Sequence, residues 1–534
     1  MQFRQPVPRR AKPTTAQVKS FPAPTSGWIA NQNLAIASER MPNGQVLRGA
    51  AVLENWFPTQ TGIRMRAGTE KFATIGDGED DVAALFSYRA GNNAKLFAAT
   101  DTAIYDISSP ADPDVSPTAD VDSLTSGDWS TVQFATSGGT FLVCVNGEDA
   151  ARNYDGSAWA TTPAITNVSS DELSHVSSFK RRIWFVEGAS LNLWYLPVDS
   201  IGGAATKFPM DGIFNRGGSI LFTASISMDS GAGLDDRFVI ITTEGEFAVY
   251  EGFDPGTAAD WSLVGVYQMG RPRGKNAVMR AGGDRVVATD IGFVSVISAM
   301  QLDAAALAPN AVSAPISTAW TDYVRLRAGS PWYVNLWPTR QMAMVALPTP
   351  VADRPEMLIV NVQTGAWALF TGWQALCLET FGDRCFFGST EGRIYECEVT
   401  GADAGMPYTA ACVPLFDDCK TPASRKISHQ ARAVLLAPRD PSEVMSAQAD
   451  FAINLPSVPS SPVIVDGSLW GVGTWGESVW GQLRERNTFQ RWQSTFGTGS
   501  VLAPSVQVTS GAIVAPDIDL VRIDMTYETA DIVT

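Results

Sequence analysis

The sequence predicts an all-β protein built around a β-propeller of six or seven blades, and two observations lead to this expectation. The chain has 534 residues, of which 46 are glycine and 32 are proline, and only 18% are charged. Long helices expose many charged side chains, whereas short strands need frequent turns, so the composition favours β structure. A strand–turn–strand unit also recurs with a period in the forties, which is typical of propeller blades.

Each repeat has a β-branched or aromatic run, a tight turn rich in Gly, Asp or Asn, and a second such run, which is the pattern of a β-hairpin. The turn glycines make the spacing measurable. Gly147 and Gly188 are 41 residues apart, Gly245 and Gly292 are 47 apart, and Gly392 follows Gly292 by 100 residues, which accommodates two units. The predicted hairpins are 95–108, 141–154, 182–198, 237–251, 285–298, 357–370 and 384–399.

Two short helices are expected in this β framework. Ile316, Trp320 and Tyr323 recur at helical spacing after Pro315, which suits the first turn of a helix. This predicted helix, 313–327, would pack on the side of the ring or against a neighbouring molecule, so its three apolar residues are candidate interface residues. A second short helix is expected over 46–58.

The chain divides into four predicted parts. Residues 1–20 form a flexible basic arm, 21–75 the N-terminal part of a composite platform domain, 76–401 the propeller and 402–534 the C-terminal β-rich part of the platform. A chain that enters and leaves a ring at one place brings its two flanks together, so 21–75 and 402–534 are expected to fold as one unit. The strand-like runs of the C-terminal flank are 433–436, 451–455, 505–509 and 520–527.

Charge is unevenly distributed along the chain. Arg4, Arg9, Arg10 and Lys12 lie in a stretch without acidic residues, and we expect this arm to dock on the acidic surface of a partner. The whole chain nevertheless has a net charge of −16, which argues against a general binder of nucleic acid or anionic membranes.

Trp470, Trp475 and Trp480 are five residues apart, and each is followed by glycine. This pattern has two interpretations. A row of indoles can form a platform for sugars, or it can anchor a subunit interface, as tryptophans commonly do. The interface interpretation is favoured, and the three residues are candidate contacts.

No catalytic constellation, metal site or cofactor site is expected. The chain has two histidines, His175 and His429, and neither has a metal-ligand partner at short spacing. The acidic run 77–81 is interpreted as a solvated turn, and the cysteines as small buried apolar residues in a reducing compartment. We also expect no signal peptide and no membrane span.

The segment 53–68 resembles an N-terminal signature of the tail nozzle proteins of short-tailed bacteriophages. That signature has an Asn and a Pro followed by a Gly, a basic residue and a second Gly, here Asn55, Pro58, Gly62, Arg66 and Gly68. The family often has Pro before the last Gly, where this chain has Ala67. The segments 491–499 and 518–528 are similar to the closing β-segment of tail tubular protein B and of the packaged-DNA stabilisation proteins.

The resemblance implies a structural virion protein and not an enzyme. Such proteins form a homohexameric ring at the distal end of a short tail, dock on a head-to-tail adaptor ring and lie near tail fibres or spikes. Genomic double-stranded DNA is retained by the ring and then passes through its lumen without specific binding. The protein would be assembled in the bacterial cytoplasm and reside in the phage tail. The alternatives are a carbohydrate- or protein-binding propeller, which would need a secretion route, and a propeller hydrolase, which would need clustered carboxylates or histidines.

Overall fold

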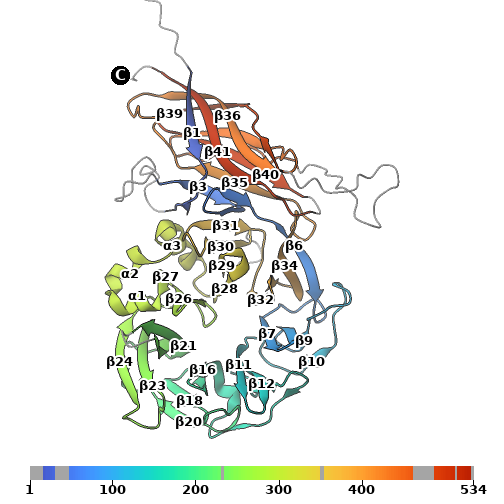
Figure 1. Ribbon diagram of the computed structural model, residues 1–534, viewed down its shortest axis with the longest axis vertical. Helices are drawn as coiled ribbons and strands as arrows, with labels where there is room; N and C mark the ends of the chain where they lie inside the picture. The colour runs from blue at the N-terminus through green and yellow to red at the C-terminus, as the bar shows by residue number, and fades with distance from the viewer. Residues whose placement is uncertain are drawn as a thin grey trace, which may run out of the picture.

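The computed structural model describes residues 16–30, 47–229, 234–348, 354–460, 486–511 and 514–530, and strands dominate it. Figure 1 shows a ring of small sheets at one end of the molecule and a layered β domain at the other. Neighbouring strands within these small sheets run antiparallel. The predicted fold class, a β-propeller with a domain made from both flanks, is therefore confirmed.

Six small sheets form the blades of the ring, and the first strand of most of them lies nearest its centre (Figure 1). The first blade has β7 (Ala84–Ala90), β8 (Asn93–Ala99), β9 (Ile104–Asp106) and β10 (Ala119–Val121), and the second has β11 (Ser130–Thr136), β12 (Gly139–Val145), β13 (Arg152–Tyr154) and β14 (Trp159–Ala160). The third has β16 (Leu173–Phe179), β17 (Arg182–Glu187), β18 (Asn192–Tyr195) and β20 (Thr206–Pro209), and β15 (Ile165–Thr166) pairs with β19 (Gly203–Ala204) beside it.

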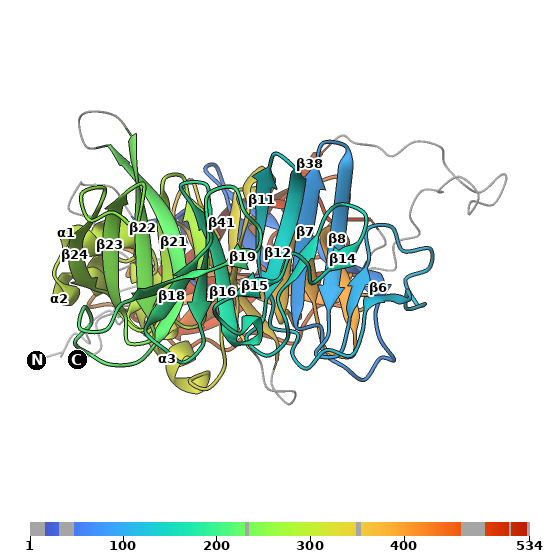
Figure 2. The ribbon, with the colours of Figure 1, turned by 90° about the horizontal axis from the view of Figure 1, so that it is seen from below.

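The fourth blade has β21 (Ile220–Asp229), β22 (Leu234–Thr242), β23 (Glu246–Gly252) and β24 (Trp261–Gln268), which stand side by side in Figure 2. The fifth has β25 (Val278–Ala281), β26 (Asp284–Thr289) and β27 (Gly292–Ser295). Between the fifth and sixth blades stand β28 (Tyr333–Trp337), β29 (Met342–Ala346), β30 (Glu356–Asn361) and β31 (Trp367–Thr371), which belong to a nine-stranded sheet.

The sixth blade closes the ring with strands from both ends of the propeller. It has β32 (Cys377–Phe381), β33 (Arg384–Gly388) and β34 (Arg393–Thr400), and its outer strand is β6 (Gly68–Thr74) from the N-terminal side. Because β6 pairs with β34 while β32 contacts β7, the first and last blades cannot separate without breaking a sheet.

Each predicted hairpin corresponds to two neighbouring strands of one unit, except at the end of 285–298. Most are the second and third strands, and 357–370 corresponds to β30 and β31. The turns at Gly147, Gly245 and Gly392 have φ angles of 86°, 78° and 63°, which favour glycine. At Gly392 a side chain would also collide with a backbone oxygen 2.1 Å away. The spacing of these glycines therefore reports real turns between paired strands.

Among the described residues, α-helices occur at one place in the ring, after β27, and short 3₁₀ turns occur at Ser170–Glu172 and Pro338–Arg340. The chain forms α1 (Val296–Gln301), α2 (Ala304–Asn310) and α3 (Ser317–Leu326), so the predicted hairpin 285–298 ends in a helix rather than a strand. The Ser295 side chain accepts a hydrogen bond from Ser298 N and caps α1. The predicted helix 313–327 is present as a short 3₁₀ turn, Ala314–Ile316, followed by α3.

The flanking domain joins strands from both ends of the chain in two packed sheets. The seven-stranded sheet contains β1 (Gln17–Pro22), β4 (Trp56–Pro58), β5 (Ile63–Met65), β36 (Lys426–Ala437), β38 (Asn487–Phe489), β39 (Gln493–Gly499) and β41 (Asp519–Thr529). The nine-stranded sheet adds to β28–β31 the strands β2 (Gly27–Trp28), β3 (Gly49–Glu54), β35 (Tyr408–Pro414), β37 (Val444–Ala449) and β40 (Leu502–Ser510).

Three expectations for the flanks need correction. The segment 49–58 is strand and not helix, because β3 pairs with β35 and is buried on both faces, and periodicity alone cannot separate such a run from a buried helix. Residues 17–20 of the predicted arm belong to β1, which pairs with β41. The run 451–455 is not a strand, because Asp450 and Phe451 have positive φ angles and form a turn after β37.

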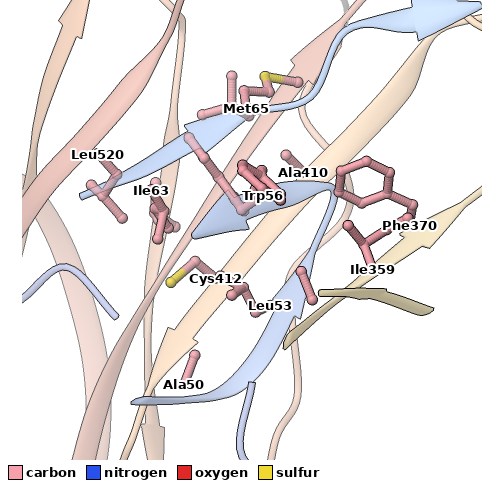
Figure 3. Close-up of a cluster of buried hydrophobic side chains, with 14 of the residues drawn as sticks. Ala50, Leu53, Trp56, Ile63, Met65, Ile359, Phe370, Ala410, Cys412 and Leu520 are labelled. Atoms are coloured by element: carbon pink, nitrogen blue, oxygen red, sulfur yellow. The ribbon is translucent and has the colours of Figure 1, made fainter. Parts of the chain in front are cut away.

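One apolar cluster runs from the flanking domain into the ring. Trp56, Leu53 and Leu520 of the flanks pack with Ile359 and Phe370 of β30 and β31 (Figure 3). Trp56 and Phe370 are fully buried. The two halves of the molecule therefore share a core, and no open linker separates them.

Candidate functional site

The residues that carry the resemblance meet at a buried junction between the ring and the flanking domain. Asn55 connects β3 to β4 with a φ of 57°, a left-handed conformation that asparagine tolerates better than most residues. Its amide nitrogen donates to Thr371 Oγ1 (2.9 Å) and Thr409 O (2.7 Å), and its amide oxygen accepts from Thr371 N (2.9 Å). Asn55 thus ties the end of β31 and the start of β35 to the N-terminal flank.

Arg66 has no exposed surface, and all five of its N–H groups are bonded. Nε donates to Asn55 Oδ1 (2.8 Å), and the terminal nitrogens donate to Thr371 O (2.8 Å) and Ala67 O (2.9 Å). The same two nitrogens hold both carboxylate oxygens of Asp403 at 2.8 and 2.6 Å. A buried charge is tolerated only when it is paired and fully hydrogen-bonded, and Arg66 meets both conditions.

Aromatic rings enclose the Arg66–Asp403 pair. The rings of Tyr408 and Trp373 lie 3.9 and 4.8 Å from the guanidinium carbon, and the indole of Trp373 donates to Asp403 Oδ1 at 3.0 Å. The Tyr408 hydroxyl donates to Arg66 O. Burial is the main cause that raises the pKa of Tyr408, so this hydroxyl stays protonated and keeps donating.

The other motif residues are also placed by backbone packing. A side chain at Gly68 would lie 2.1 Å from Ala402 O, and one at Gly62 would lie 3.0 Å from Leu520 O. Pro58 O accepts a hydrogen bond from Asn361 Nδ2 at 2.9 Å. The motif therefore specifies close contacts of the N-terminal flank with both the ring and the C-terminal flank.

The structure explains the departure from the motif at Ala67. Its backbone N–H donates to Glu398 Oε1 at 3.1 Å, and proline would remove this donor. Glu398 also accepts from Arg64 Nη1 at 2.9 Å. Glu398 is itself buried, so the loss of either donor would leave its carboxylate underbonded.

The partners of the junction were missed by sequence reasoning. Thr371, Glu398, Asp403 and Tyr408 lie more than 300 residues from Asn55 and Arg66, and closure of the ring brings them together. Asp403 lies between small residues in 401–405, a sequence that fits an ordinary turn. The signature thus identifies the residues that the N-terminal flank contributes to the junction. Their partners can be identified only from the fold.

A lysine crosses the centre of the ring at one end. Lys275 precedes β25 of the fifth blade, and its ammonium donates to Asp128 O (2.8 Å) and Ser174 O (3.2 Å), beside the second and third blades. It also pairs with the Asp128 carboxylate at 2.9 Å. Blades on opposite sides of the ring are therefore within reach of one side chain at this end.

The charge of Lys275 acts on His175. Burial first, and then the nearby Lys275, lower the pKa of His175 to about 3, so this imidazole is neutral at physiological pH. Its Nδ1 has no hydrogen-bond partner. A neutral, half-buried histidine of this kind fits a packing role.

Glu379 lies where the first and last blades meet. Its Oε1 accepts from Ser87 Oγ of β7 at 2.7 Å, and the adjacent Thr380 O accepts from Arg89 Nη2 at 2.7 Å. Burial raises the pKa of Glu379 to about 7, although the Ser87 bond and Arg89 act in the opposite direction. Its charge state therefore changes near neutral pH at the closure of the ring.

The predicted interface residues have different locations. Ile316 and Trp320 are buried in this chain's own core, and Tyr323 packs against the same core. A neighbour that contacts α3 would meet exposed side chains such as Leu326 instead. Trp470, Trp475 and Trp480, and the arm residues Arg4, Arg9, Arg10 and Lys12, lie outside the described residues.

The remaining candidates show no reactive arrangement. In the acidic run 77–81, Asp77 accepts from Glu79 N and Asp80 accepts from Thr102 Oγ1. All six cysteines are buried free thiols, as predicted for Cys377, Cys385 and Cys397. Among the residues that the structure describes, no group of three His, Cys, Asp or Glu side chains could hold a metal ion, and no helix is long and apolar enough to cross a membrane.

Comparison with known proteins leaves the function open. No family model matches the chain, and no curated protein matches it. The solved structures that are similar include the computationally designed Ika8 protein (TM-score 0.36, 9% identity, 62% of this chain and 100% of that one) and BBS1N in complex with ARL6DN (0.37, 11%, 66% and 100%). Chaetomium thermophilum Raptor is similar over 62% of this chain and 29% of its own (0.37, 9%).

Similarities at this level carry no argument about this chain, and its fold rests on the strand pairing described above. None of these three names concerns a phage tail. The resemblance to tail nozzle proteins therefore stays a prediction.

Proposed function

We propose that this chain is a structural protein of a short bacteriophage tail, the nozzle at its distal end, and that several copies form a tube around the DNA path. The observation that carries the proposal is the Arg66 junction. The residues of the nozzle signature fix the ring on the platform through a fully bonded buried ion pair and a shared core. This supports a rigid part of an assembly, which a tube that contains pressurised DNA requires.

The path for DNA would lie between copies and not through the ring of one chain. The Lys275 side chain extends from the fifth blade to Asp128 O and Ser174 O, at 2.8 and 3.2 Å, and so occupies the space between these blades. A duplex therefore cannot pass this end of the ring. A ring of several copies, six by resemblance, supplies the wider opening.

The charge of the chain fits a conduit. With a net charge of −16, the protein attracts duplex phosphates poorly, so DNA would slide and not adhere. The proposed partners are a head-to-tail adaptor ring, to which the basic arm would dock, and tail fibres or spikes. The proposed location is the virion, after assembly in the bacterial cytoplasm.

Electron microscopy of assembled particles tests the proposal directly. We expect six copies around a central opening at the end of a short tail, with portal, terminase and adaptor genes flanking the coding sequence. A monomer that binds glycans on an array, or an assembly with two-fold or three-fold symmetry, would contradict it. The glycan result would support the carbohydrate-binding alternative.

A further inference from the structure

The outer strand of the fourth blade, β24, differs from the other outer strands of the ring. It is eight residues long, has the sequence WSLVGVYQ and contains no charged residue and no proline. Among the strands that the structure describes, only β23 pairs with it, so its other edge is open. Leu263 and Val266 are 41% and 37% exposed on this strand. A long, apolar, open edge is a site to which another chain can add.

The other outer strands are protected, which makes them internal controls. β10 and β14 have three and two residues, β20 contains Lys207 and Pro209, and β6 contains Glu70 and Lys71. α1 and α2 contact β27, while β31 pairs with β2 and β3. β24 is protected in part, because α1 contacts it and a bulge lies opposite Val249 and Tyr250, but beyond the bulge 265–268 pair regularly with β23.

One segment beside β24 carries little charge, whereas its paired neighbour β23 carries Glu246 and Glu251. The segment 296–312, which contains α1 and α2, has Asp303 as its one charged residue. α1 contacts β24, and Leu302 and Val312 are exposed at the ends of this segment. Figure 1 shows β24, α1 and α2 together on one side of the ring. In a chain with a net charge of −16, a 17-residue segment with one charged residue is an exception.

Charge indicates which partner fits this surface. A basic partner would be attracted by carboxylates, and the segment 296–312 offers it only Asp303. Two acidic chains repel each other unless their contact excludes charge, so an uncharged, apolar surface fits a second copy of this chain. A head-to-tail contact between such copies closes into a ring when its rotation allows.

We infer that the open edge of β24, together with α1 and α2, is the surface through which each copy contacts the next copy. The inference rests on the proposed function, because it assigns one side of the contact in the proposed ring. An extended segment of the neighbour pairs with the edge of β24, and Leu263 and Val266 become buried on contact. β24 thus gains the neighbour that it lacks in the single chain.

Lysine substitutions on the full-length chain test the inference. The double variant Leu263→Lys, Val266→Lys puts two charges at the contact, and both positions are exposed, so the fold is retained. The matched control is Val115→Lys, Val198→Lys, which changes two exposed valines elsewhere on the ring. Sedimentation velocity over a range of concentrations measures self-association, and circular dichroism checks the fold.

We expect wild type and control to associate alike, and the Leu263/Val266 variant to need a concentration higher by about tenfold or more. Equal association of that variant, or a wild type that is monomeric at every soluble concentration, would overturn the inference. Native mass spectrometry separates the two proposals. A six-fold ring unaffected by the lysines would refute the β24 contact alone, and a two-fold or three-fold complex abolished by them would refute the nozzle alone.

Discussion

At Arg66, the free energy of burying a charge determines which side chains the junction accepts. Its five donors are matched by five acceptor contacts from four residues, and Asp403 loses its main partner if the guanidinium is removed. A lysine supplies one nitrogen in place of a planar fork and cannot reproduce this set. The junction therefore selects arginine.

Replacement of Arg66 by methionine is expected to lower the free energy of unfolding by about 2–4 kcal/mol, because the Asp403 carboxylate, 13% exposed, loses both guanidinium bonds and keeps only the Trp373 bond. Urea denaturation measures the loss. The control is Arg181→Met, which removes an exposed pair with Asp199 and should cost about 0–1 kcal/mol. Equal losses in the two variants would show that the junction contributes no more than a surface pair.

Glu379 should make stability depend on pH. Its pKa is raised to about 7 in the folded chain and is lower in the unfolded chain, so the folded state binds the extra proton between these values. The contribution of Glu379 to the free energy of unfolding is thus greatest at low pH and is lost as the pH rises to about 7. Above that pH the free energy of unfolding falls no further, and the total loss is up to about 3 kcal/mol.

The variant Glu379→Gln stays neutral and can still accept the Ser87 bond. We expect the difference in unfolding free energy between this variant and wild type to grow in the variant's favour from pH 5 to pH 8. The exposed Glu148→Gln is the control. A difference that does not change with pH would contradict the assignment of the shift to Glu379.

At the scale of elements, the sequence predicted mainly the second and third strands of the units, together with β31, and it did not predict the first strands or the short outer strands. Central strands such as RIWFVE (Arg182–Glu187) are buried on both faces and read as apolar runs. First strands such as LSHVSSF (Leu173–Phe179) line the middle of the ring and mix polar with apolar residues. Fourth strands of two to four residues leave no pattern to detect.

The candidate site was predictable only in part for a related reason. Asn55 and Arg66 are close in sequence and belong to a recognisable signature. Their partners come from β31, β34, β35 and the 401–405 turn, and no local pattern connects segments so far apart. Lys275 and Glu379 likewise acquire their roles from ring geometry.

The boundary of the N-terminal arm can be tested by two deletions. Removal of residues 1–15 leaves β1 intact, and we expect no change in melting temperature. Removal of residues 1–22 deletes β1 with the buried Phe21 and the hydrogen bond from Ser20 to Asp524, so it should destabilise the chain by about 3 kcal/mol or more. Equal melting temperatures would mean that β1 contributes little to the sheet.

At the scale of the whole molecule, both the rigidity and the negative charge of the chain fit the proposed role in a tail. The ring is closed by β6 and joined to the platform by a continuous core, so the two halves should move as one body. In the proposed tail, a body of this kind would transmit force from one partner to the next. In the proposed role, its negative net charge would keep it from adhering to DNA.

The purified chain is therefore expected to show no appreciable affinity for duplex DNA at physiological salt. Basic proteins bind DNA non-specifically with dissociation constants of about 10⁻⁴–10⁻⁶ M, and a chain with a net charge of −16 should bind more weakly than this range. A gel shift at several salt concentrations measures this affinity.

The variant that lacks residues 1–15 is the control, since Arg4, Arg9, Arg10 and Lys12 are concentrated there. Weak binding at low salt that disappears in this variant would locate the residual attraction in the arm, and the rest of the chain would fit a passive conduit. Sub-micromolar binding with a steep salt dependence in both proteins would contradict the proposed role.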